Sequence, residues 1–229
     1  MKLFIFLLIA TLFVLLPHKS AIADESQDKS TINNNSAIIQ KDKDYSTLYE
    51  RNTLITSERV GGKEDPNVAA SLVYLANTYK FQGKNNLAEP LYVRAITIYE
   101  KALSPDHPNV ATTLNKLAEL YVTEGQYSKA EKLYMRAVEI DEKAFGRDQP
   151  EVAIDLNNLA EMYKTKGNYD QSEKLLIRSL SIMEKNFGVN HPSVAPILSN
   201  LAFIYRKTDR NEEASKLEIR VDTILKQGS

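Results

Sequence analysis

Apolar positions recur every 42 residues between residues 65 and 229, and this period is the dominant pattern of the chain. The most regular column consists of leucines, at Leu72, Leu114, Leu156 and Leu198. Within a repeat the apolar residues are spaced by three and four positions, which is typical of one face of an α-helix. The first stripe of the first repeat comprises Leu72, Leu75, Ala76 and Tyr79, and the second comprises Ala88, Leu91, Ala95 and Ile98. The pattern therefore predicts two helices per repeat.

Proline and glycine mark the ends of these helices. Four prolines stand 42 residues apart, at Pro66, Pro108, Pro150 and Pro192. Proline suits the first turn of a helix, because the N–H that it lacks would have no partner there and its fixed φ is compatible with the helix. The first helix is predicted to end at a glycine with positive φ, at Gly83, Gly125 and Gly167, and the fourth repeat departs from this pattern with Asp209 at the aligned position.

The helix pairs are expected to depend on their neighbours. Small residues such as Ala76 and Ala88 allow the two helices of a pair to cross closely. Each pair still leaves an apolar flank that only the next pair can cover, so about three or more pairs must stack. The sequence predicts an all-α solenoid whose four repeats occupy residues 65–106, 107–148, 149–190 and 191–229. Residues 44–64 are predicted to form a preceding half repeat, equivalent to a second helix.

The aligned columns resemble the tetratricopeptide repeat, whose first helix carries Leu-(Gly/Ala)-x-x-Tyr and whose second helix is rich in alanine. The stretch from His107 to Ala137, "HPNVATTLNKLAELYVTEGQYSKAEKLYMRA", is similar to the long repeats of kinesin light chains. The resemblance covers residues 65–229. It implies a right-handed superhelical solenoid of antiparallel helix pairs, with a concave surface, lined by the first helix of each pair, that binds peptides or other proteins.

The resemblance assigns a set of first-helix positions to this concave surface. The candidate peptide-binding residues are Tyr74, Asn77, Lys80, Asn115, Lys116, Glu119, Asn157, Asn158, Glu161, Lys164, Asn200 and Phe203. Stacking is expected to bring the asparagines into a row, where they hold an extended peptide backbone while lysine, glutamate and tyrosine select its side chains. The alternative is that these residues form the ordinary solvent face of each helix. Recurrent asparagine, which is a poor helix former, and apolar residues within the stripe favour a groove.

The N-terminus has the three-part layout of a secretory signal peptide. A lysine at position 2 precedes an apolar run from Leu3 to Leu16, and Ala21-Ile22-Ala23 predicts cleavage after Ala23. The apolar run is shorter than the ~20 residues of a membrane-spanning helix, although an uncleaved anchor is the alternative. We therefore expect residues 1–23 to be removed, residues 24–43 to form a disordered polar leader, and the mature protein to be periplasmic or secreted, without stable membrane insertion.

Charge and composition exclude several function classes. The net charge is −1, and loss of Lys2 and Lys19 with the signal peptide would make it −3, so no basic surface for nucleic acid is expected. The chain has no cysteine, and its eight glycines all fall at predicted helix ends or near the tail, which leaves none for a phosphate-binding loop. His107 and His191 precede helix-starting prolines, which explains them better than a metal pair does. No catalytic residue, metal site or cofactor is therefore predicted.

Three functional hypotheses follow from these observations. The first is a non-catalytic scaffold that binds a protein or peptide of unknown identity in the concave groove. The second is a structural protein that self-associates through the open ends of the solenoid. The third, an enzyme or a carrier of a small ligand, finds no supporting residues in the sequence. Because one repeat scaffold serves unrelated ligands, the sequence does not identify the partner.

Overall fold

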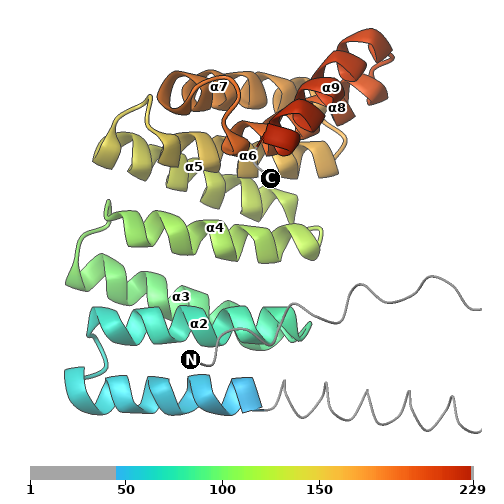
Figure 1. The fold of residues 1–229 in the computed structure, drawn as a ribbon. Coiled ribbons are helices and arrows are strands. Elements are labelled where there is room, and N and C mark those ends of the chain that lie inside the picture. Colours follow the sequence, from blue (N-terminus) through green and yellow to red (C-terminus); the bar gives the residue numbers. More distant parts are fainter. Residues whose placement is uncertain (1–44, 228–229) are drawn as a thin grey trace, which may run out of the picture. The chain divides into compact units, whose positions relative to one another are not determined.

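The computed structural model describes residues 45–227, and every regular element within that range is helical. Residues 45–61 form a helix, and four helix pairs follow it in chain order (Figure 1). The pairs are α2 (Pro66–Phe81) with α3 (Asn85–Ala102), α4 (Pro108–Thr123) with α5 (Tyr127–Phe145), α6 (Pro150–Thr165) with α7 (Tyr169–Phe187), and η1 (Pro192–Val194) and α8 (Ala195–Lys207) with α9 (Asn211–Gln227). The predicted all-α architecture of helix pairs is confirmed. The predicted signal peptide (1–23) and leader (24–43) lie outside the described residues, and the repeat boundaries stay predictions.

The prolines begin the first helices, but the fourth repeat starts differently. Pro66, Pro108 and Pro150 are the first residues of α2, α4 and α6. Pro192 instead opens the 3₁₀ turn η1, in which the N–H of Ala195 donates to the carbonyl of Pro192. An α-helix would need that carbonyl to accept from residue 196, which is a proline and has no N–H. The second proline therefore shortens α8 to 13 residues, against 16 in α2, α4 and α6.

Three of the four first helices begin with a side-chain cap. Asp65 Oδ1 accepts a hydrogen bond from the N–H of Asn67 at 2.7 Å. His107 and His191 perform the same role through Nδ1, at 3.1 and 3.3 Å from the backbone nitrogen two residues later. A cap of this kind satisfies one of the backbone donors that have no partner within the helix. The two histidines thus have a structural function at helix starts.

The first helices all end in one type of turn. In the first repeat the N–H of Lys84 donates to the carbonyl of Tyr79 at 2.9 Å, and the N–H of Gly83 bonds to the previous turn, which together form a Schellman motif. The motif needs positive φ at its glycine position, and φ is 73° at Gly83, 73° at Gly125 and 81° at Gly167. Asp209 has φ 61° and is the one non-glycine residue with positive φ in the described range. The predicted helix ends are therefore confirmed.

Close packing within each pair depends on small side chains. The residues at the closest approach in the first two pairs are fully buried: Ala76, Ala88, Ala118 and Ala130. In the third pair, serines replace two such alanines without leaving a polar atom unsatisfied. The Ser172 hydroxyl donates to the carbonyl of Ala160 and the Ser179 hydroxyl to that of Ala153, both at 2.6 Å. The narrow spacing is thus retained, because a serine hydroxyl that bonds across the interface costs little to bury.

Successive second helices are bridged by a repeated ion pair. The arginine–glutamate pairs are Arg94–Glu58, Arg136–Glu100, Arg178–Glu142 and Arg220–Glu184, with nitrogen–oxygen distances of 2.5–2.7 Å. Glu58 belongs to the helix at residues 45–61, so that helix contacts α3 as α3 contacts α5. Partly exposed pairs of this kind contribute about 0–1 kcal/mol each, so they orient the stack more than they stabilise it. The main stabilising term is the burial of apolar columns, including Val68, Val110, Val152 and Val194, each of which is 0% exposed.

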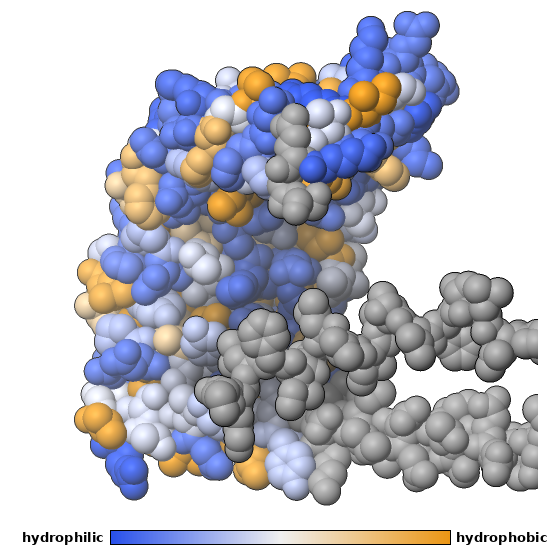
Figure 2. All heavy atoms as spheres, in the orientation of Figure 1, coloured by the Kyte–Doolittle hydropathy of each residue, from blue (hydrophilic) through white to orange (hydrophobic). Residues whose placement is uncertain are grey.

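The first helices lie on the inner side of the stack. Helix α4 contacts α6, and α6 contacts α8, through a few residues each, whereas the second helices of successive pairs are joined by long side chains such as those of Arg136 and Arg178. Closer spacing on one side of a stack produces curvature toward that side. Figure 2 shows that hydrophilic residues cover most of the visible face, with hydrophobic residues in separate small patches.

Replacing Asp209 by glycine is expected to stabilise the protein by about 0.5 kcal/mol, because glycine reaches positive φ without steric strain. The Asp209 side chain is exposed and makes no ion pair or hydrogen bond with the described residues, so little is lost. The reciprocal substitution, Gly167→Asp, is the matched control and should destabilise by about 1 kcal/mol. Urea unfolding of the three proteins checks both values, and a less stable Asp209→Gly protein would contradict this account of the turn.

Candidate functional site

Polar contacts join the first helices of neighbouring repeats along the inner surface. Lys80 of α2 lies 2.5 Å from the Glu119 carboxylate of α4, measured between Nζ and Oε2. Asn115 of α4 donates a hydrogen bond from Nδ2 to Asp155 Oδ1 of α6 at 2.5 Å. Three of these four residues were predicted to lie in the groove, and the structure brings them to one surface. Asp155, which completes the contact between α4 and α6, was not predicted.

The same type of contact continues from α6 to α8. Asn200 Nδ2 donates to Asn157 Oδ1 at 3.1 Å, and Asn200 Oδ1 accepts from Lys164 Nζ at 2.7 Å. In the first repeat, Asn77 Oδ1 accepts from the hydroxyl of the buried Tyr92 at 2.6 Å. The sequence analysis expected these asparagines to hold a peptide backbone. The structure shows that they hold neighbouring helices, so their hydrogen-bonding capacity is partly used within the protein.

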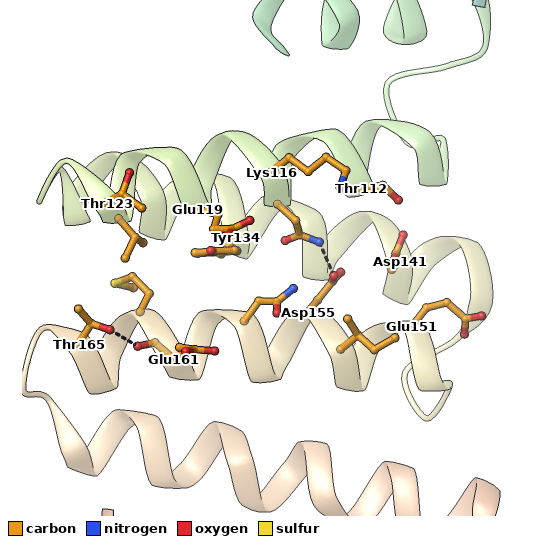
Figure 3. A pocket seen from close by; sticks show the side chains of 15 residues that line it. Thr112, Lys116, Glu119, Thr123, Tyr134, Asp141, Glu151, Asp155, Glu161 and Thr165 are labelled. Carbon is orange, nitrogen blue, oxygen red and sulfur yellow. Dashed lines mark hydrogen bonds between the residues drawn. The ribbon is translucent and has the colours of Figure 1, made fainter. Parts of the chain in front are cut away.

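A cavity of about 540 Å³ opens between α4 and α6, with side chains of α5 reaching into it (Figure 3). Five of the predicted groove residues line it: Asn115, Lys116, Glu119, Asn158 and Glu161. The Lys116 ammonium and the Asn158 amide make no hydrogen bond or ion pair with the described residues, so they can contact a ligand. The cavity is bounded by two successive repeats and exists only when these repeats stack.

The wall of this cavity contains two buried carboxyl groups. Asp155 of α6 is 2% exposed and Asp141 of α5 is 7% exposed, and both line the cavity (Figure 3). Three buried oxygens here, Asp155 Oδ2, Asp141 Oδ1 and Asn115 Oδ1, accept no hydrogen bond from the described residues. Buried polar atoms without partners are uncommon and costly in native proteins. The cavity therefore has an excess of hydrogen-bond acceptors on its wall.

Burial raises the pKa of both carboxyl groups above the usual value for aspartate. Burial raises the pKa of Asp155 to about 7, and the negative charge of Asp141 raises it further against the opposing hydrogen bond from Asn115. Burial also raises the pKa of Asp141 to about 6, an effect that the interaction with Asp155 opposes and the charge of Glu151 reinforces. The two groups are close enough to share one proton, so the second ionisation is the unfavourable one.

The sequence contains a signal for these acids that the analysis above did not use. On the 42-residue period, Asp155 falls in the column of Ser71, Thr113 and Ile197, and Asp141 falls in the column of Tyr99, Met183 and Leu225. An acid in a column that is otherwise apolar or weakly polar is a departure from the repeat. The two departures are 14 residues apart and lie on different helices. They predict a shared polar site only if α5 is known to pack against α6, which the structure shows.

The remaining predicted residues do not line this cavity. Tyr74 of α2 is 62% exposed, beyond the contacts between α4 and α6. Phe203 of α8 lines a separate hollow, where its ring lies 6.5 Å from that of Tyr169 and is approached by the ammonium groups of Lys164 and Lys207 at 5.5 and 5.6 Å. Some of the predicted residues therefore lie in one or the other of two distinct hollows, others lie in neither, and a continuous groove stays a prediction.

The family model of the tetratricopeptide repeat matches residues 67–143 and 151–221, which is more than half of the chain. Together with the repeated helix pairs, this match shows that the chain belongs to the tetratricopeptide repeat family. The resemblance stated from the sequence is thus confirmed. A search of curated proteins gives no match.

Several solved structures share the fold. BtubC (BKLC) from P. vanneervenii has a TM-score of 0.72 at 22% identity, over 82% of this chain and 75% of that one. A Podosopora anserina putative kinesin light chain with nearly identical tetratricopeptide-like repeats has a TM-score of 0.68 at 23% identity, over 91% and 99%. A Rap protein complexed with Competence and Sporulation Factor has a TM-score of 0.64 at 16% identity, and this chain covers 51% of its length. At these identities the likeness shows the fold alone.

Two further properties concern the described residues only. None of their helices combines the length and the apolar character that crossing a membrane requires. Within the same range, no group of three or more histidine, cysteine, aspartate and glutamate side chains is arranged to hold a metal ion.

The buried acids predict how stability depends on pH. Their pKa values in the folded protein exceed the ordinary value of 3.8, so their favourable contribution is fully present below pH 3.8 and is lost as pH rises from there through about 6 to 7. The Asp155→Asn substitution removes the second charge and can donate to Asp141. We expect this variant to be more stable than the wild type at pH 8 by roughly 2 kcal/mol, with a much smaller difference at pH 5.

Denaturant unfolding of both proteins at the two pH values tests this expectation. Glu139→Gln is the matched control, because Glu139 is an exposed acid on α5 and its loss should leave the pH dependence unchanged. A difference between wild type and Asp155→Asn that is the same at both pH values would contradict the assignment of a raised pKa to this pair.

Proposed function

We propose that the chain is a non-catalytic interaction scaffold that binds a peptide or an extended protein segment along the inner surface of its first helices. The observation that carries this proposal is the cavity between α4 and α6, which is lined by polar side chains of two repeats, including Lys116 and Asn158, whose polar groups make no bond with the described residues. Extended segments bind such surfaces through polar groups that meet the peptide backbone and hollows that take individual side chains.

The polar contacts between repeats indicate which side chains remain available to contact a bound segment. The asparagines that join neighbouring helices are already bonded, so Lys116 and Asn158 are the better candidates for direct contact. The contacts also fix the positions of the side chains around the cavity. A surface that is organised before binding loses less entropy when a ligand arrives. A Rap protein of similar fold was solved in complex with Competence and Sporulation Factor, which supports ligand binding only at the level of the fold.

We also propose that the protein is exported and acts in the periplasm or outside the cell. The support is the sequence alone: a lysine at position 2, the apolar run that follows, and Ala21-Ile22-Ala23. The intact mass of the protein recovered from an exporting bacterial host tests the proposal. We expect a chain that begins at Asp24, and a chain that keeps its N-terminal 23 residues would contradict cleavage.

Self-assembly through the ends of the solenoid is the second candidate function. One observation favours it, since the last helix, α9, exposes Ile219 (67%) and Leu225 (56%). Light scattering at high protein concentration separates the two functions. A mass that stays monomeric would end the assembly proposal and leave the scaffold proposal intact.

Selection from a phage-displayed library of random dodecapeptides tests the scaffold directly. We expect the immobilised protein to enrich a family of related peptides. The Lys116→Ala/Asn158→Ala double substitution should weaken their binding at least tenfold, because it removes the two unpartnered polar groups of the cavity. Its effect on unfolding should be small, since neither side chain bonds to the described residues.

The matched control is Lys132→Ala, which removes an exposed lysine of α5 that does not line the cavity. We expect this variant to bind the selected peptides as the wild type does. Equal loss of binding in Lys132→Ala and in the double variant, or full binding by the double variant, would place the peptide elsewhere and contradict the proposed site.

A further inference from the structure

The chemistry of the cavity wall indicates which kind of side chain the cavity would accept. Asp141 and Asp155 are both more than nine-tenths buried, and when both are ionised each has an oxygen that receives no hydrogen bond from the described residues. Asn115 adds a third such oxygen, because its Nδ2 is the atom that bonds to Asp155. All three residues line one cavity (Figure 3), and the three acceptor oxygens are buried in its wall, so a donor must enter the wall to reach them.

The charged groups around these oxygens are mostly acidic. Each element that forms the cavity contributes at least one acid: Glu119 from α4, Asp141 from α5, and Glu151, Asp155 and Glu161 from α6. Lys116 of α4 is the one cationic side chain among the described lining residues, and the Tyr134 hydroxyl of α5 also faces this space. Glu119 and Glu161 are paired with Lys80 and Lys164, which do not line the cavity, so the lining acids without a cationic partner among the described residues are Asp141, Glu151 and Asp155. This remaining excess of negative charge attracts a cation.

The cavity also has an apolar wall beside its acceptors. Ile154 and Val122 line it, and Met162 forms part of its base. An alkyl chain can lie along these residues while its charged end reaches the carboxylates, as lysine and arginine side chains do when their stems are buried. An ammonium group offers three donors and a guanidinium five, which is enough to satisfy all three oxygens.

We propose that this cavity binds the cationic end of a lysine or arginine side chain in the bound segment, with its alkyl stem against Ile154. The inference rests on the proposed scaffold function and specifies which residue the scaffold recognises. Without a ligand, one proton shared by Asp141 and Asp155 limits the repulsion between them. A bound cation displaces that proton, so binding is coupled to proton release and strengthens as pH rises.

Two small probes that differ in charge test the inference, whatever the natural segment is. N-acetyl-lysine methylamide carries the ammonium group, and N-acetyl-norleucine methylamide has a similar alkyl stem without it. In ¹H–¹⁵N and methyl NMR spectra of the whole protein at pH 7.5, we expect the lysine probe, at millimolar concentration, to shift the Asn115 side-chain amide and the Ile154 methyl signals. The norleucine probe should not shift them, and the response to the lysine probe should fall at least fivefold at pH 5.

Substitution of the acids supplies the second arm. Asp155→Asn and Asp141→Asn should each weaken binding of the lysine probe at least tenfold at pH 7.5, whereas Glu139→Gln, an exposed acid outside the cavity, should not change it. Using two variants keeps the test valid if one fails to fold. N-Butylammonium reproduces the lysine side chain without its backbone and should bind comparably to the capped lysine. A selected library peptide containing lysine that binds no more tightly than N-butylammonium would identify a small-amine site and overturn recognition of a segment.

Several outcomes would overturn the inference. They are equal shifts by the norleucine probe, no shift by the lysine probe, unchanged binding in both aspartate variants, or displacement of the lysine probe by stoichiometric Ca²⁺ or Mg²⁺. Failure here is distinguishable from failure of the scaffold function. If the selected peptides depend on Lys116 and Asn158 but contain no basic residue, the scaffold function is supported and the preference of the cavity for a cation is refuted.

Discussion

The stacking of each helix pair on the next is the interaction on which the rest of the structure depends. A single pair buries its small residues internally but leaves an apolar flank that only a neighbour can cover. Apolar side chains such as those of Leu72 and Leu114 are almost completely buried because an adjacent helix pair covers them. Two polar systems follow the stack, the arginine–glutamate pairs between second helices and the lysine and asparagine contacts between first helices. They orient the pairs, while the apolar contact holds them together.

The candidate site is a product of that stacking, because no repeat contains it alone. Asn115 comes from one helix pair and Asp155 from the next, while Asp141 reaches the same space from α5. The site is also a local departure from the repeat, since two acids occupy columns that carry apolar or weakly polar residues elsewhere. Keeping these acids buried reduces stability at neutral pH, as their raised pKa values indicate. Sites that oppose the stability of a fold in this way are often functional.

The fold was predictable from the sequence because residues close together in the chain determine where each helix begins, ends and exposes its apolar face. Helix spacing, the first-turn prolines and the glycines with positive φ are all local features, and Asp209 retains its φ even without a glycine. The candidate surface was predicted only in outline. The resemblance to the repeat family placed Asn115 and Asn157 on the concave face, but it did not reveal that Asp155 and Asn200 would occupy their hydrogen bonds. Those partners lie 40 and 43 residues away, so they depend on how the pairs stack.

Native-state hydrogen exchange of the whole protein tests the dependence on stacking most directly, because it reports the free energy of opening for each helix. Interior pairs have neighbours on both sides, so amides of α4 to α7 should exchange slowest, through openings close to global unfolding. Helix α9, at the end of the stack, should open at a clearly lower free energy. Protection of α9 equal to that of α5, or an interior pair that opens while both its neighbours remain closed, would contradict the account.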